Sequence, residues 1–188
     1  KAASHANAGG FILVNQPASR TGNPGIQQFA LECRELKVSV DIHCLMAQTL
    51  IEQVFVNNTD LRLEGYFYFP IPKGSVINQF QMDVNGVMTD AELLVAGKAR
   101  QIYEDIVRSL KDPALLEYAE QDLFRVRIFP IEPRSTKQIR ISYREMITAD
   151  NGTCMYRFPM NTKKYASAPV REVLFNLKIR CEEEIKNM

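Results

Sequence analysis

The sequence is poor in several residues and patterns that particular functions require. It has no tryptophan and two histidines, His5 and His43, so few residues are available for histidine-based catalysis. No stretch approaches the roughly 20 apolar residues that a membrane-spanning helix needs, and the longest apolar runs, such as Phe11–Val14, have the length of a strand. Lys and Arg (23) nearly balance Asp and Glu (22). This balance argues against a general nucleic-acid-binding or polybasic membrane protein, because both depend on excess positive charge.

What is present is the composition of an ordinary globular protein. The 188 residues are 46% hydrophobic and 24% charged, which predicts one folded domain with a sizeable core. The first ten residues are small and polar and lack the apolar centre of an export signal. We therefore expect any export signal to lie outside this sequence. Because the chain ends soon after a strong strand pattern, we also expect it to be a fragment of a longer protein.

Alternation of apolar and polar residues with a period of two dominates the chain and predicts half-buried β-strands. In the clearest case, every second residue from Leu36 to Met46 is apolar and shares one face. The next strand continues to Val56 with Leu50, Val54 and Val56 in phase. A hairpin is expected from 76–84 and 87–95, around an Asn85-Gly86 turn that supplies positive φ. Further strands are expected at 62–69, 123–129, 137–146, 153–158 and 172–181.

Two helices interrupt the strand pattern. Residues 97–110 carry a single apolar stripe with helical spacing, and Asp112-Pro113 is typical of the start of a short second helix. The fold class expected is mainly β: an antiparallel β-sandwich with both helices packed on it. Residues 1–30 are expected to form an N-terminal extension and loop, and 31–188 the sandwich domain.

The four cysteines, Cys33, Cys44, Cys154 and Cys181, leave their state open. They form no CxxC pair, so a zinc site is not predicted. Cys44, Cys154 and Cys181 fall in phase with apolar neighbours on expected strands, which favours buried thiols. A disulfide is the alternative, and four cysteines allow three pairings, among which the sequence does not choose.

No catalytic, cofactor-binding or metal-binding residue is predicted. His43 and Cys44 are adjacent on a strand and point to opposite faces, so they cannot act together. Asp83 and Asn85 resemble part of a calcium loop, but a third acidic ligand and the closing Glu are missing. Asn57 and Asn151 each begin an Asn-x-Thr glycosylation sequon, which matters only in a eukaryotic secretory protein.

Two groups of side chains are candidates for a partner-contact face. Tyr66 and Tyr68 could bind a partner or a sugar, although such residues more often pack inside a fold. A set of arginines would line the polar face of one hairpin if strands 123–129 and 137–146 pair, with a solvated surface as the alternative interpretation. This set consists of Arg125, Arg127, Arg140 and Arg144.

Several motifs in order resemble one known family. The segment Glu64–Pro72 is similar to the core motif of the VIT domain, the vault protein and inter-alpha-trypsin inhibitor domain. Lys98–Glu104 resembles the family's K-A-R-x-x-Y-E helix, and Asp112–Glu117 and Phe129–Pro133 resemble its bacterial members. The resemblance covers about Leu36 to Tyr143, and the strands that follow fit the same module.

The resemblance implies a non-catalytic protein-interaction or scaffold module of an exported, bacterial, multidomain protein involved in adhesion. In the family this module usually precedes a von Willebrand type A domain, so the partner expected is that domain or an external protein. No cofactor, nucleic acid or membrane insertion is implied for this chain. The location expected is extracytoplasmic: periplasmic, at the cell surface, or anchored through segments outside the chain. A carbohydrate-binding module using Tyr66, Tyr68 and the arginines is the alternative, and an enzyme is the third class considered.

Overall fold

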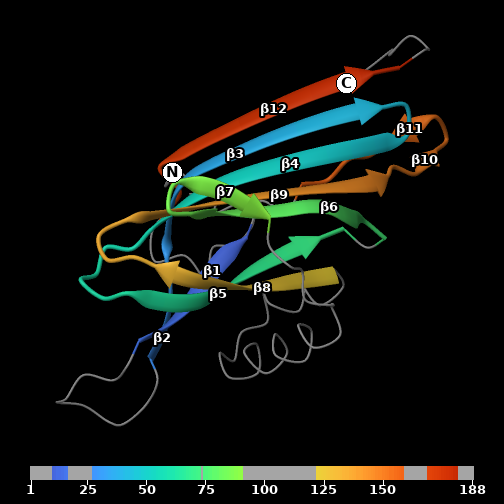
Figure 1. The fold of residues 1–188 in the computed structure, drawn as a ribbon. Helices are drawn as coiled ribbons and strands as arrows, with labels where there is room; N and C mark the ends of the chain where they lie inside the picture. The colour runs from blue at the N-terminus through green and yellow to red at the C-terminus, as the bar shows by residue number, and fades with distance from the viewer. Residues whose placement is uncertain (1–9, 17–26, 73, 91–121, 159–168, 182–188) are drawn as a thin grey trace, which may run out of the picture.

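The computed structural model describes residues 10–16, 27–72, 74–90, 122–158 and 169–181. All regular structure in these ranges is β, which confirms the expected class (Figure 1). The strands are β1 (Phe11–Gln16), β2 (Gln27–Ala30), β3 (Glu32–His43), β4 (Met46–Val56), β5 (Leu63–Ile71), β6 (Val76–Val84), β7 (Val87–Asp90), β8 (Asp122–Ile131), β9 (Thr136–Met146), β10 (Ala149–Asp150), β11 (Thr153–Cys154) and β12 (Glu172–Arg180). Both expected helices, 97–110 and the one after Asp112, lie outside the described residues.

The strands form two larger sheets and one small hairpin. The six-stranded sheet has the order β12-β3-β4-β9-β6-β7, the four-stranded sheet has the order β2-β1-β5-β8, and β10 pairs with β11. The expectation of a wholly antiparallel arrangement is wrong at one place, because β12 joins the edge of β3 in parallel. Figure 1 shows these two strands running side by side in the same direction at the margin of the larger sheet.

Alternation along β3 places its apolar residues inside. Leu36, Val38 and Val40 are buried, as the pattern predicts. The strand ends earlier than the pattern, because the chain turns at Cys44 with a φ of 53°. On β4 the predicted phase is wrong: Ile51 and Phe55 are buried, and the residues predicted in phase with one another lie on the other face.

The two larger sheets share one hydrophobic core. Phe67 of β5 contacts Phe55 of β4 and Phe80 of β6, with ring centroids 6.1 and 5.7 Å apart. Phe69 of β5 contacts Tyr143 of β9 at 6.1 Å. Each large aromatic side chain that leaves water contributes on the order of 2–3 kcal/mol to folding. These rings therefore hold the four-stranded sheet against the six-stranded one.

Ile12 and Val14 of β1 belong to this core. Gly10 donates its N–H to Gln53 Oε1 and accepts a hydrogen bond from Gln53 Nε2, both at 3.0 Å, which joins β4 to the start of β1. A Cβ atom on Gly10 would lie 2.3 Å from the Phe67 ring, so only glycine fits this close approach. β1 then pairs with β5, and β2 with β1. The part of the chain assigned to an extension up to residue 30 therefore contributes two strands to the four-stranded sheet.

The predicted hairpin between β6 and β7 is confirmed as far as Asp90. Its strands pair in antiparallel register around Asn85 and Gly86, whose φ values are 54° and 82°. Residues 91–95, the rest of the returning strand, lie outside the described residues. The strand expected at 153–158 is shorter than predicted, since β11 ends at Cys154.

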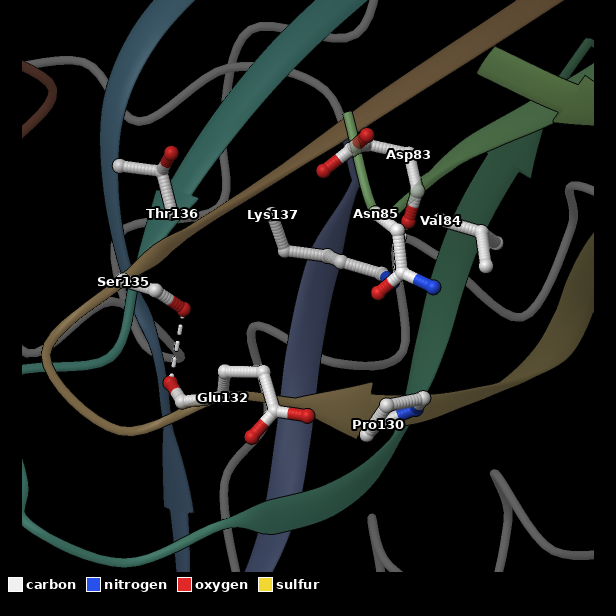
Figure 2. A pocket seen from close by; sticks show the side chains of 8 residues that line it. All are labelled: Asp83, Val84, Asn85, Pro130, Glu132, Ser135, Thr136 and Lys137. Atoms are coloured by element: carbon white, nitrogen blue, oxygen red, sulfur yellow. Dashed lines mark hydrogen bonds between the residues drawn. The ribbon is translucent and has the colours of Figure 1, made fainter. Parts of the chain in front are cut away.

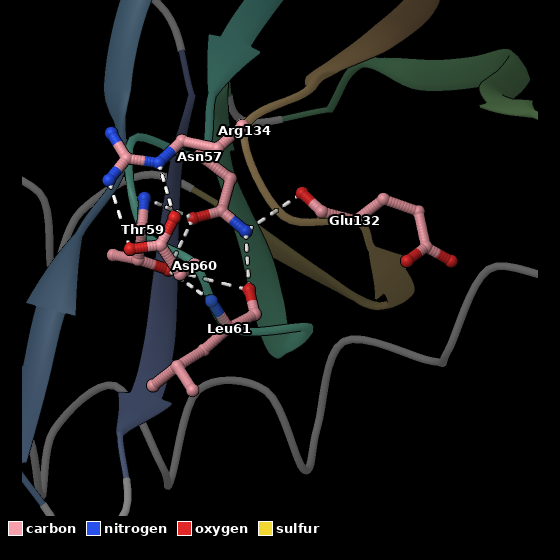
Figure 3. A network of polar contacts seen from close by, with 6 residues as sticks. All are labelled: Asn57, Thr59, Asp60, Leu61, Glu132 and Arg134. Atoms are coloured by element: carbon pink, nitrogen blue, oxygen red, sulfur yellow. Dashed lines mark hydrogen bonds and ion pairs between the residues drawn. The ribbon is translucent and has the colours of Figure 1, made fainter.

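Two connections between the sheets meet at Asn57. The chain passes between the sheets after β4 and again after β8. The Asn57 side-chain nitrogen donates to the backbone oxygens of Leu61 and Glu132, each at 2.8 Å, while Oδ1 accepts from the N–H and the hydroxyl of Thr59 at 3.0 and 2.7 Å (Figure 3). Asn57 is fully buried, so these bonds satisfy a group that has no access to water.

An exposed ion pair links the connection after β4 to the connection after β8. Arg134 Nε lies 2.7 Å from Asp60 Oδ1, and its Nη2 donates to Oδ2 at 3.0 Å. The backbone N–H of Arg134 also donates to the oxygen of Thr59 at 3.0 Å (Figure 3 shows the cluster). The glycosylation interpretation of Asn57 is therefore wrong, because its side-chain nitrogen is buried and occupied. Asn151, in the other sequon, lies in an exposed turn.

We predict that Asn57→Ala destabilises the protein by about 2–3 kcal/mol, since it leaves buried backbone oxygens without donors. Asn58→Ala is the matched control, because Asn58 makes an exposed hydrogen bond to Glu32 and should cost less than about 0.5 kcal/mol. Urea unfolding followed by circular dichroism measures both. Equal midpoints for the two variants would contradict the role given to Asn57.

Candidate functional site

The predicted arginine face does not exist as one surface. β8 pairs with β5, whereas β9 pairs with β4 and β6, so the expected pairing of these two strands is wrong. The physical reason is that the chain crosses from one sheet to the other between Ile131 and Thr136. Arg125 and Arg127 therefore lie on the four-stranded sheet, and Arg140 and Arg144 on the six-stranded one.

Two of these arginines are paired with carboxylates. Arg127 Nε donates to Glu64 Oε1 at 2.6 Å, and this hydrogen bond lowers the pKa of the Glu64 carboxyl. Arg140 Nη2 donates to Glu52 Oε1 at 2.7 Å and its Nη1 to Gln81 at 3.3 Å. These pairs are typical of a solvated sheet surface. A contact role for Arg125 and Arg144 stays a prediction.

The two tyrosines differ in exposure. Tyr68 is 2% exposed and stacks on Phe11 with ring centroids 5.3 Å apart. Tyr66 lies two residues away on the same face of β5 and is half-buried. Since a sugar-binding platform needs an open ring face, the prediction that Tyr68 contacts a ligand or partner is wrong. A contact role for Tyr66 stays a prediction.

The cysteines are mostly outside the core, contrary to the buried-thiol interpretation. Cys33 is buried, and burial raises the pKa of its thiol to about 11. Cys44, Cys154 and Cys181 are exposed. The reason is that all three lie in turns, short hairpins or strand ends, where the alternation of a long strand no longer applies.

A small cavity lies between the β6–β7 turn and the start of β9 (Figure 2). Its volume is about 150 Å³, well below the roughly 300–1,000 Å³ of sites for drug-sized ligands. Lys137 reaches across it, and its Nζ donates to the backbone oxygen of Asp83. Burial lowers the pKa of the Lys137 ammonium. Because the Lys137 ammonium, the one cation that lines the cavity, already donates to the backbone, we interpret the cavity as a structural feature and not as a binding site.

The described part of the chain holds no group of three residues suited to a metal ion. It also contains no helix long and apolar enough to cross a bilayer. His43 is exposed, and Asp41 beside it on the same face pairs with Arg180, with 2.7 Å between Asp41 Oδ2 and Arg180 Nη2. His43 and Asp41 therefore lie on the surface of the sheet, and Asp41 is already paired with Arg180.

The most unusual surface is β12. Val173, Phe175 and Leu177 stand in register with Leu36, Val38 and Val40 of β3. The three β3 residues are at most 3% exposed, whereas the three β12 residues are 41–51% exposed. Leu174 on the opposite face is 46% exposed.

We call these four residues, Val173, Leu174, Phe175 and Leu177, the β12 strip. In the described sheet β12 has a neighbour on one side only, so its outer backbone edge is also open. Sequence reasoning predicted the strand but missed its exposure. The available signal was an apolar residue at Leu174, on the face that should have been polar.

Comparison with known families gives a direct result. The family described as the vault protein inter-alpha-trypsin domain (VIT) matches residues 33–143, which is more than half of the chain. The chain belongs to the VIT family. The expected resemblance is thereby confirmed.

Three known proteins are similar to this VIT domain. It is 25% identical over 150 residues to human von Willebrand factor A domain-containing protein 5A, covering 77% of this chain and 19% of that protein. It is 26% identical over 160 residues to the pig inter-alpha-trypsin inhibitor heavy chain H2, covering 84% and 17%. It is 23% identical over 114 residues to the mouse protein mono-ADP-ribosyltransferase PARP4, covering 61% and 6%. The chain therefore spans less than a fifth of each of these relatives.

A polar cluster lies at the end of the core between β4 and β9. Thr49 Oγ1 and Tyr156 OH are 2.7 Å apart in a hydrogen bond, and burial raises the pKa of the nearby Tyr143 hydroxyl. Glu145 follows on the same face of β9, and its Oε1 is buried without a hydrogen-bond partner among the described residues. Burial raises the pKa of this carboxyl above its ordinary 4.5.

We predict that Glu145→Gln makes the VIT domain more stable than the parent at about pH 7. Because the pKa of the Glu145 carboxyl is higher in the folded protein than in the unfolded one, folding favours the protonated acid. The stability that this acid contributes is fully present below the unfolded-state pKa and is lost as the pH rises through the folded-state pKa. The variant cannot ionise, and its advantage should vanish below about pH 4.

Thermal unfolding across this pH range measures the effect. Glu172→Gln removes the same charge from an exposed position and controls for net charge. An advantage of Glu145→Gln that grows in acid would contradict the prediction.

Proposed function

We propose that this VIT domain is a non-catalytic protein-interaction module, built as a two-layer β-sandwich, and that the β12 strip is its contact surface. The observation that supports this is the exposure of Val173, Leu174, Phe175 and Leu177 on a strand at the edge of the larger sheet. Contiguous apolar surface on a soluble domain commonly marks an interaction site.

The composition of β12 is unusual for an edge strand. Natural edge strands are commonly shortened, bulged, or protected by proline and charges. β12 is nine residues long, has no proline and keeps a continuous register against β3. Its charged residues, Glu172, Lys178 and Arg180, lie towards its two ends, so 173–177 are uncharged. Such an edge offers a partner both backbone hydrogen bonds and apolar side chains, which are the two components of strand addition.

The partner we propose is a von Willebrand type A domain. The human relative is named as a protein that contains this domain, and the family resemblance implies the same order of modules. We further propose that the complete protein is bacterial and exported, and that it acts in adhesion on the extracytoplasmic side. An external protein is the alternative partner to the type A domain. The support for a bacterial source is the resemblance of Asp112–Glu117 and Phe129–Pro133 to bacterial members.

Binding fits the described residues better than catalysis does. His43 is exposed, Cys33 is buried with a raised pKa, and the cavity around Lys137, at about 150 Å³, is small for a substrate. The match to the ADP-ribosyltransferase covers 6% of that protein, too small a part to transfer its activity. The carbohydrate-binding alternative loses its platform with the burial of Tyr68.

We predict that the double variant Phe175→Ser/Leu177→Ser weakens binding to the type A domain encoded in the same gene about tenfold or more, because central apolar anchors carry most of the energy of an interface. Isothermal titration with the separately produced type A domain measures the dissociation constant.

The matched control is Leu61→Ser. Leu61 is 46% exposed, comparable to the β12 residues, and lies in the connection between β4 and β5. Binding should be unchanged in this control. Equal loss in both variants, the absence of binding by the parent, or a gene without a type A domain would each overturn the proposed partner.

A further inference from the structure

Two of the four cysteines are brought together by the parallel pairing of β12 with β3. In this ladder Arg180 stands opposite His43, so the next residue on each strand is a cysteine, Cys181 and Cys44. The backbone N–H of Cys44 donates to the oxygen of Arg180 at 3.0 Å. This hydrogen bond completes the last pair of the ladder, and the two cysteines are the residues that directly follow this pair on the two strands.

The spacing of such positions suits a disulfide. Neighbouring strands lie about 4.8 Å apart, and disulfides join Cα atoms that are roughly 4.4–6.8 Å apart. Cys44 lies in the turn after β3 with a φ of 53°, and Cys181 directly follows β12. Neither residue lies within the regular pleat of a strand, and both side chains are exposed.

The other two cysteines are less suited. Cys33 of β3 is buried, 3.5 Å from the Gln53 amide nitrogen, and its raised pKa keeps it as a thiol. Cys154 belongs to the β10–β11 hairpin, where it stands opposite Ala149. Of the three pairings that four cysteines allow, the strand register thus favours the one that joins Cys44 to Cys181.

We propose that Cys44 and Cys181 are a disulfide site that closes in an oxidising environment and fastens the end of β12 to β3. In the reaction with glutathione disulfide, the two protein thiols lose two protons and two electrons. One protein S–S bond forms, the glutathione S–S bond breaks, and two glutathione thiols take up the protons and electrons. This inference does not depend on the proposed function.

The bond would act at the C-terminal end of β12. β12 pairs with β3 alone in the described sheet, and near this end the side-chain link is the exposed pair of Arg180 with Asp41. Exposed ion pairs contribute little to stability, whereas a covalent link across a long loop restricts the unfolded chain strongly. Closing the disulfide should therefore slow the opening of β12.

The test is oxidation of the reduced, purified protein with glutathione disulfide, followed by peptide mapping by mass spectrometry without reductant. The expected product is a peptide pair joined through Cys44 and Cys181. The variant Cys33→Ser/Cys154→Ser should form the same pair, and Cys44→Ser and Cys181→Ser should not. Stable glutathione adducts on Cys44 and Cys181, or a link from either one to Cys154, would overturn the proposal.

A second readout reports on β12 itself. Amide hydrogen exchange of residues 172–180 should slow by about tenfold on oxidation of the parent, since the opening of the strand becomes restricted. The same oxidant should leave exchange unchanged in Cys44→Ser. Equal exchange in the reduced and the cross-linked parent would show that the bond does not fasten β12, and this would contradict the second half of the proposal.

Discussion

The structure depends on one constraint: each of the two larger sheets has an apolar face that must be covered by the other. Phe67 and Phe69 of the four-stranded sheet meet Phe55, Phe80 and Tyr143 of the six-stranded sheet. Removing this common apolar surface from water is the main favourable term in folding. The connections between the sheets then have to turn tightly at the border of the core, and the hydrogen bonds of buried polar side chains make those turns possible.

The same constraint explains why β12 stands apart. The inward-facing residues of strand β3, Leu36, Val38, Val40 and Ile42, are buried. β12 extends the larger sheet by one strand, beyond the part that the smaller sheet covers, so Phe175 and Leu177 remain exposed although they face the same way. An exposed apolar strand at the edge of the larger sheet is consistent with a module whose edge completes its burial on another protein.

Prediction from the sequence succeeded where local pattern and environment agree. The family, the β class, the alternation of β3 and the Asn85-Gly86 turn follow from short segments. The phase of β4 was wrong because polar Thr49 and Gln53 face inward, each held by a hydrogen bond to a distant segment. The arginine face was wrong because sequence spacing does not tell a hairpin from a crossover between sheets. The exposure of Val173, Phe175 and Leu177 could not be predicted, since it depends on how far the second sheet extends, whereas Leu174 on the other face gave a local signal.

The central claim is that the β12 strip is a protein contact surface. Its most direct test compares amide hydrogen exchange in the isolated chain with exchange in the full-length protein from its natural source. The account predicts that residues 172–180 exchange more slowly in the full-length protein, while β7, at the opposite edge of the same sheet, exchanges equally in both. Equal exchange at β12, with new protection on another surface, would contradict the claim.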